Sequence, residues 1–209
     1  GALLAPGRME AIASLGPCVI SDEIYHGLSY EGRAHSILEF TDNAFVLNGF
    51  SKRYAMTGWR LGYVIAPESF IRPMQKLQQN FFISAGSVAQ YAGLAALREA
   101  GADVARMAGV YDERRRFMVK RLRQLGFGIP VIPTGAFYVL ANARHLDEDS
   151  YRLAFDILER AGVAVTPGID FGRAAEGYLR FTYANSREKI AAAMDRLEDY
   201  LASRDSASR

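Results

Sequence analysis

The sequence has little of three features that would point to particular classes of protein. It contains one cysteine, Cys18, so no disulfide can form within the chain, as is usual in a reducing compartment. Its formal net charge is only +2, which gives no electrostatic argument for a nucleic-acid partner. No apolar run approaches the roughly 20 residues that span a bilayer, and the opening GALLAPG shows no signal-peptide pattern. We therefore expect a cytoplasmic protein without a nucleic-acid or membrane partner. Cys18, inside the apolar run PCVI, is expected to be buried and to have no redox role.

One segment is nevertheless strongly basic: DERRRFMVKRLRQLG, residues 112–126. Val110, Phe117, Leu122 and Leu125 form an apolar stripe through it with helical spacing. The alternative, a patch that binds nucleic acid, has no recognisable motif to support it. We interpret the arginines as the solvated face of a helix.

Half of the residues are hydrophobic and 23% are charged, which is ordinary for a globular protein. Residues 1–106 contain short apolar runs bounded by glycine or proline, which are typical of a sheet covered on both faces in α/β folds. Helical patterns follow, and one of them ends at Gly101. The runs are PCVIS, AFVLNG and GYVIAP, and the helical segment is SVAQYAGLAALREAG.

Residues 107–209 have a different pattern, which predicts a smaller α+β domain. A long amphipathic helix is expected from about Asp103 to Leu125, bridging into this part. Asn185 and Glu188 have the spacing of a helix N-cap and its capping-box partner. The expected strands are GAFYVLA and GYLRFTYA, and the expected helices are DSYRLAFDILERAG and NSREKIAAAMDRLEDYLAS.

The stretch NGFSKRYAMTGWRLGY, residues 48–63, places Lys52 just beyond a predicted strand. In open α/β sheets, ligands bind beyond the carboxyl ends of the strands. A lysine there can attack a carbonyl group and form a Schiff base. The alternative is an ordinary solvated lysine.

Asp22, Tyr25 and Arg60 would complete a site around Lys52. Asp22 ends the apolar run VIS and would emerge at the same edge of the sheet, with Tyr25 three residues later. Alternatively, Asp22 caps the next turn and Tyr25 packs in the core. Arg60 lies between Gly58 and Gly62, and its fork suits a phosphate. Together these groups suit a phosphorylated pyridine aldehyde, which indicates pyridoxal 5'-phosphate.

These motifs resemble those of the class I/II aminotransferases, which are fold-type I pyridoxal phosphate enzymes. GFSKRYAMTGWRLG is similar to the family's lysine signature at every restricted position, and SDEIY to its strand-end Asp and Tyr. The segments SVAQYAGLAAL, GAFYVL, GVAVTPGIDFG and YLRFTYANS resemble later family blocks, in the expected order. The resemblance covers essentially the whole chain. It implies the remainder of a large mixed-sheet α/β domain, followed by a smaller α+β domain.

The resemblance also implies a role for each site residue. Lys52 would form the internal aldimine and later move the proton at the substrate α-carbon. Asp22 would keep the pyridine nitrogen protonated, Tyr25 would hydrogen-bond the phenolic oxygen, and Arg60 would bind the phosphate. Arg180 would hold the substrate α-carboxylate with its planar fork. From the residues alone, Arg180 would instead be a strand residue in an ion pair.

The sequence departs from the family pattern in two respects. Gly49 replaces a serine that helps many relatives to bind the phosphate, and Ser51 or a backbone N–H is the candidate substitute. The opening GALLAPGRMEAIASLG resembles the segment just after the family's Asn-Pro-Thr-Gly turn. We therefore expect a C-terminal portion, with the rest of the cofactor site in a missing half and in the second subunit of a homodimer. Such a portion is not expected to form a complete site on its own.

Three functions remain open at this point. The first is an aminotransferase that exchanges an amino group between an L-amino acid and a 2-oxo acid. The second is a Cβ–S lyase, because the same scaffold and the same residues serve both reactions. The third is a non-catalytic regulatory domain that binds pyridoxal phosphate, although no helix-turn-helix segment is visible. No metal site is predicted, and the choice of amino acid is not encoded in these motifs.

Overall fold

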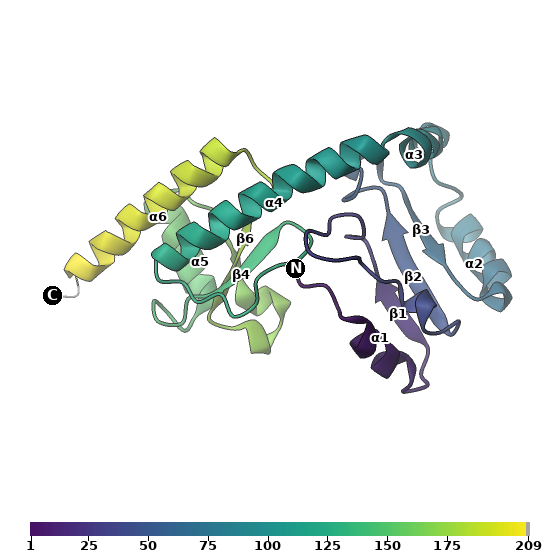
Figure 1. Cartoon of the computed structure of the whole chain (residues 1–209), viewed down its shortest axis with the longest axis horizontal. Coiled ribbons are helices and arrows are strands. Elements are labelled where there is room, and N and C mark those ends of the chain that lie inside the picture. The colour runs from purple at the N-terminus through teal and green to yellow at the C-terminus, as the bar shows by residue number, and fades with distance from the viewer. Residues whose placement is uncertain (208–209) are drawn as a thin grey trace. The chain divides into compact units, whose positions relative to one another are not determined.

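The computed structural model describes residues 1–207, which form two compact units (Figure 1). One unit is Leu3–Ala108, and the other comprises Gly1–Ala2 together with the described residues from Gly109 onward. The predicted domains, residues 1–106 as part of a large cofactor-binding domain and residues 107–209 as a small C-terminal domain with the bridging helix, stay a prediction. Among the described residues, no helix has the length and apolar character needed to cross a membrane.

The first unit is built around a three-stranded sheet in the order β1-β2-β3. Strands β1 and β2 are parallel, with Asp22 opposite Leu47, and β2 and β3 are antiparallel, with Gly49 opposite Gly62. The three apolar runs predicted as strands are therefore strands. The elements are α1 (Pro6–Ala13), β1 (Val19–Asp22), η1 (Ile37–Glu39), β2 (Ala44–Gly49), η2 (Thr57–Trp59), β3 (Gly62–Ile65), α2 (Glu68–Phe81), α3 (Ser87–Glu99) and the start of α4 (Gly101–Gln124).

The faces of this sheet are covered unequally. Helix α1 and η1 cover one face, where Met9, Ile37 and Val46 form a buried cluster. On the other face, Ile20 is 72% exposed and Leu47 is 42% exposed. On this second face, Phe45 of β2 contacts Phe70 of α2, with ring centroids 5.1 Å apart. Among the described residues, the prediction of a sheet covered on both faces is therefore met in part, with α2 over Phe45 while Ile20 and Leu47 stay exposed.

The second unit pairs an antiparallel sheet, in the order β4-β6-β5, with three helices. Alternate strand residues such as Val139, Leu179 and Phe181 face the core, as do Leu122 of α4, Leu153 of α5 and Leu197 of α6. The prediction of a smaller α+β unit is met. Besides the rest of α4, its elements are β4 (Tyr138–Asn142), α5 (Ser150–Ala161), β5 (Thr166–Pro167), η3 (Gly168–Phe171), η4 (Arg173–Ala175), β6 (Tyr178–Thr182) and α6 (Arg187–Ala207).

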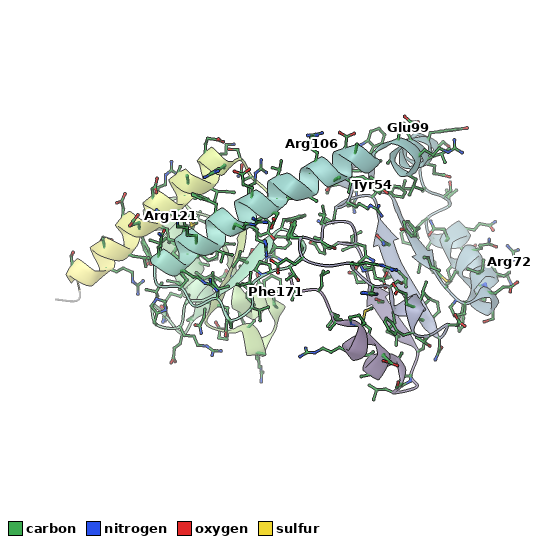
Figure 2. The ribbon with its side chains drawn as sticks, in the orientation of Figure 1. Tyr54, Arg72, Glu99, Arg106, Arg121 and Phe171 are labelled. Atoms are coloured by element: carbon green, nitrogen blue, oxygen red, sulfur yellow. The ribbon has the colours of Figure 1, made fainter. Side chains whose placement is uncertain are left out.

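Arginines of the basic segment of α4 make ion pairs and hydrogen bonds within the second unit. Arg121 donates to Asp195 and Glu198 of α6, over 2.8 and 3.0 Å (Figure 2). Arg115 is only 4% exposed and donates to the Asp112 carboxylate and to the Pro133 carbonyl. Arg115 is thus an exception to the predicted solvated face, because a carboxylate and a carbonyl satisfy its buried guanidinium.

Three local predictions need correction. Cys18 is exposed, because β1 begins only at the next residue. Gly101 does not end a helix; α3 ends at Glu99 and Gly101 starts α4. The cap of α6 lies one residue later than predicted, since Ser186 Oγ accepts from Lys189 N while the Asn185 side chain accepts from Ser186 N.

Candidate active site

The predicted site residues of the first unit lie at the carboxyl ends of β1 and β2. Asp22 is the last residue of β1, and Lys52 follows the end of β2 by three residues. Because the two strands are parallel, both ends fall at one edge of the sheet. Lys52 Nζ lies 6.0 Å from the centroid of the Tyr25 ring. The fold therefore brings the amine, the phenol and the strand-end carboxylate to the same edge.

The Asp22 carboxylate has one oxygen in use. Its Oδ1 accepts a hydrogen bond from the Ile24 backbone N–H, 3.1 Å away, so Asp22 does cap the following turn. Its Oδ2 has no hydrogen-bond partner among the described residues, and the side chain is exposed. The turn fixes the direction of the carboxylate and leaves Oδ2 as an acceptor for an incoming N–H.

The loop that carries Lys52 is held by Thr57, and Tyr54 marks this loop in Figure 2. Thr57 Oγ1 donates to the Ser51 carbonyl over 3.0 Å, and Arg60 Nη1 donates to the Thr57 carbonyl over 3.0 Å. Thr57 thus ties Ser51, next to the lysine, to Arg60. Sequence reasoning missed this residue, because threonine has no distinctive spacing in the motif.

Arg60 has a backbone conformation that is rare for residues other than glycine. Its φ and ψ are 51° and 46°, in the left-handed region, where a side chain costs about 1 kcal/mol. Such positions occur preferentially at functional sites. Apart from the bond to Thr57, the guanidinium N–H groups of this exposed side chain have no hydrogen-bond partner among the described residues. They are the donor set that a phosphate requires.

Gly49 occupies the position where many relatives carry a serine, and the local packing explains the glycine. A Cβ atom at this position would come within 3.1 Å of both the Gly62 Cα and the Leu61 carbonyl oxygen. Gly49 and Gly62 face each other across β2 and β3, so their backbones approach closely. A serine at position 49 would require the backbone to shift. Phosphate binding by Ser51 stays a prediction.

Arg180, the fifth predicted site residue, belongs to the second unit. Its guanidinium carbon lies 4.2 Å from the Tyr138 ring centroid and 4.5 Å from that of Phe171, which Figure 2 labels. Nη2 also donates to Thr166 Oγ1 over 3.4 Å. No carboxylate among the described residues lies within ion-pair distance of Arg180, so the alternative of an ion-paired strand residue is wrong.

The Tyr138 and Phe171 rings lie close to the Arg180 guanidinium. A planar guanidinium presents an N–H edge as well as two flat surfaces. That edge is the one that binds a carboxylate through two parallel hydrogen bonds. Nothing in the local sequence indicated these aromatic contacts, because Tyr138, Phe171 and Arg180 come from β4, η3 and β6.

The chain is similar to known aminotransferases along most of its length. The family model for aminotransferase class I and II matches residues 1–197. A (5-formylfuran-3-yl)methyl phosphate transaminase from Methanocaldococcus jannaschii is 44% identical, over 88% of this chain and 50% of its own length. An aspartate aminotransferase from Pyrococcus horikoshii is 43% identical, over 88% of this chain and 48% of its own length.

Solved structures give the same result. The crystal structure of an aromatic aminotransferase from Pyrococcus horikoshii has a TM-score of 0.93 and 38% identity, covering 98% of this chain and 57% of that one. This likeness confirms the predicted fold class. The chain spans about half the length of the curated relatives it matches. The family match and these identities together lead to one conclusion: this chain belongs to the class I and II aminotransferase family.

Proposed function

We propose that the protein to which this chain belongs is a pyridoxal phosphate-dependent aminotransferase that exchanges an amino group between an L-amino acid and a 2-oxo acid. The observation that carries the proposal is the edge of the first sheet, where Lys52, Tyr25 and Asp22 come together. Asp22 there has an unused carboxylate oxygen. The named relatives act on different compounds, so the proposal extends to the substrate class and not to one amino acid.

The residues present fit the cofactor. Asp22 Oδ2 would accept the N–H of the pyridine ring, the Tyr25 hydroxyl would contact the phenolic oxygen, and the N–H groups of Arg60 would bind the phosphate, with Ser51 as a second donor. Lys52 Nζ would hold the cofactor covalently through the aldehyde carbon. When bound, the cofactor supplies an electron sink for the bonds at the substrate α-carbon.

The remaining steps fall to side chains of this chain. Once a substrate amine has displaced it, Lys52 Nζ is the base that takes the proton at the substrate α-carbon and returns it. Arg180 would orient the substrate by its α-carboxylate, through the N–H edge of its guanidinium. We further propose a cytoplasmic homodimer without a metal ion or a nucleic-acid partner.

The reaction type can be tested with the complete product of the gene that encodes this chain. It would be incubated with pyridoxal phosphate, 2-oxoglutarate and a panel of L-amino acids. We expect paired formation of glutamate and the new 2-oxo acid. Release of ammonia and pyruvate without glutamate would identify a lyase instead. A protein that binds pyridoxal phosphate but turns over neither would be a regulatory domain.

Thr57 provides a test of the phosphate end of the site. We expect Thr57→Val to weaken pyridoxal phosphate binding by about 3- to 10-fold, the value of one net hydrogen bond, because residue 57 loses its side-chain bond to the Ser51 carbonyl and keeps only the backbone contact with Arg60. Binding of pyridoxal, which lacks the phosphate, should not change. The measurement is a titration of the apoprotein with each compound, followed by absorbance.

Two further variants control this test. Thr57→Ser keeps the hydroxyl and should bind as the wild type does. Thr41→Val removes a comparable loop hydrogen bond, from Asn43 N to Thr41 Oγ1, in the same unit. Equal losses for pyridoxal and pyridoxal phosphate in Thr57→Val would contradict a role at the phosphate.

A further inference from the structure

Glu23 is a buried charge that the proposed chemistry does not use. Its side chain is 5% exposed, and it is the only buried carboxylate among the described residues. It lies between two proposed cofactor contacts, directly after Asp22 and two residues before Tyr25. A buried carboxylate is costly unless hydrogen bonds or a cation compensate it. Its contacts therefore show what it holds in place.

Both carboxylate oxygens of Glu23 are occupied. Oε1 accepts from Ser21 Oγ at 3.0 Å, from Ser36 Oγ at 3.1 Å and from the Ile37 backbone N–H at 2.9 Å. Oε2 lies 3.3 Å from His26 Nδ1. One side chain thus joins the end of β1, the turn that follows it and the start of η1, although η1 lies more than ten residues further along the chain.

The contacts of the Glu23 carboxylate hold the turn between Asp22 and His26 at both of its ends. Within it, Ile24 N donates to Asp22 Oδ1, and His26 N donates to the Glu23 carbonyl over 2.9 Å. The Glu23 backbone N–H also donates to the Leu47 carbonyl over 2.8 Å and so continues the pairing of β1 with β2. Asp22 and Tyr25 stand on a turn whose backbone is fixed by the buried Glu23 side chain.

We infer that Glu23 is a positioning residue, which aims Asp22 Oδ2 and the Tyr25 hydroxyl at the cofactor by anchoring their turn to Ser36 and Ile37. The inference rests on the proposed function, because it takes Asp22 as the partner of the ring nitrogen. It predicts that loss of the anchor weakens the contact with the ring nitrogen selectively. Loss of a merely structural group would weaken every part of cofactor binding alike.

The test uses the complete gene product and two ligands, pyridoxal phosphate and its analogue with carbon in place of the ring nitrogen. We expect Glu23→Ala to weaken binding of pyridoxal phosphate by about 10-fold or more, as for a charged hydrogen bond that is lost. Binding of the analogue, which makes no such bond, should change much less. Glu23→Gln keeps an oxygen at the Oε1 position and should recover most of the affinity.

Glu39→Ala is the matched control. Glu39 caps the same η1 by accepting from Ser36 N at 3.2 Å, and its ion pairs are with Arg33 and His35, outside the Asp22–His26 turn. We expect Glu39→Ala to leave unchanged the ratio of the affinities for pyridoxal phosphate and for the analogue without the ring nitrogen. If Glu39→Ala lowered that ratio as much as Glu23→Ala does, Glu23 would act only through η1, and the inference would be overturned.

Hydrogen exchange in the cofactor-free protein provides a second readout. The amides of Ile24 and His26 should exchange faster in Glu23→Ala than in the wild type, but not in Glu39→Ala. Unchanged exchange in Glu23→Ala would overturn the inference. If Glu23→Ala does not fold, Ser36→Ala can replace it, because it removes one of the three donors to Glu23 Oε1. This variant should also lose more affinity for pyridoxal phosphate than for the analogue, by a smaller factor. An equal loss of affinity for both ligands would overturn the inference. A wild-type protein that binds no pyridoxal phosphate would refute the proposed function, while the exchange rates would still decide whether Glu23 holds the turn.

Discussion

Replacing Lys52 with alanine should abolish covalent attachment of pyridoxal phosphate and with it amino-group transfer. Lys52 Nζ is the amine at the strand edge, 6.0 Å from the centre of the Tyr25 ring. The variant loses both the attachment point and the proposed base. We expect the transfer rate to fall by at least about 10²- to 10⁴-fold, the usual contribution of a positioned acid–base group.

The measurement is direct. Wild-type protein reduced with borohydride in the presence of pyridoxal phosphate should yield one modified peptide, the one that contains Lys52, and Lys52→Ala should yield none. The visible absorption of the bound cofactor should disappear in the same variant. Lys76→Ala, at an exposed lysine of α2, is the control and should behave as the wild type does. A pH-sensitive visible band that persists in Lys52→Ala would refute the assignment.

Replacing Arg180 with alanine should weaken substrate binding and leave cofactor binding unchanged. The α-carboxylate is common to every amino acid and 2-oxo acid, so kcat/KM should fall for all of them, by about 10- to 100-fold for the loss of charge-assisted hydrogen bonds. Pyridoxal phosphate should bind to Arg180→Ala as it binds to the wild type, because its proposed partners lie on other residues. Steady-state kinetics with several amino acids, together with a cofactor titration, separate the two effects.

Arg180→Lys distinguishes charge from geometry. Lysine keeps the positive charge, but it cannot make two parallel N–H bonds or present a planar group to the nearby Tyr138 and Phe171 rings. We therefore expect it to recover little activity. Arg173→Ala, at an exposed arginine of η4, is the control and should be nearly neutral. If kcat/KM fell only for substrates with an acidic side chain, Arg180 would instead contact the side chain of the substrate.

Much of the fold and the identity of the site residues could be predicted from local sequence. The runs VISD and AFVLNG are strands because their apolar residues suit a sheet; Asp22 ends the first strand and Lys52 follows the second, at the carboxyl edge. Helices α3, α4, α5 and α6 also follow from their sequence patterns, with ends that differ from the predicted ones by up to four residues. Helices α1 and α2 were not predicted. The roles of Lys52, Asp22, Tyr25, Arg60, Ser51 and Arg180 stay predictions.

Burial was the property that local patterns predicted least well. Cys18 lies in an apolar run and is exposed, whereas Arg115 lies in a basic run and is buried against Asp112 and Pro133. The outcome in each case depends on residues distant in sequence or on where a strand begins. Likewise, the second face of the first sheet is covered by α2 at Phe45, whereas Ile20 and Leu47 on the same face are exposed.

The sequence by itself determined which chemical groups this protein has and in what order they occur: an amine after a strand, a carboxylate after its neighbour, and arginines suited to a phosphate and a carboxylate. The spacing of residues along one strand or helix is enough to predict these groups and their order, because such spacing depends only on local periodicity. Only the tertiary structure decided how these groups are held. The anchoring of the Asp22–His26 turn by Glu23 joins residues more than ten positions apart, and the aromatic contacts of Arg180 join three separate elements. Such contacts arise when distant segments pack together, and no local pattern in the sequence records them.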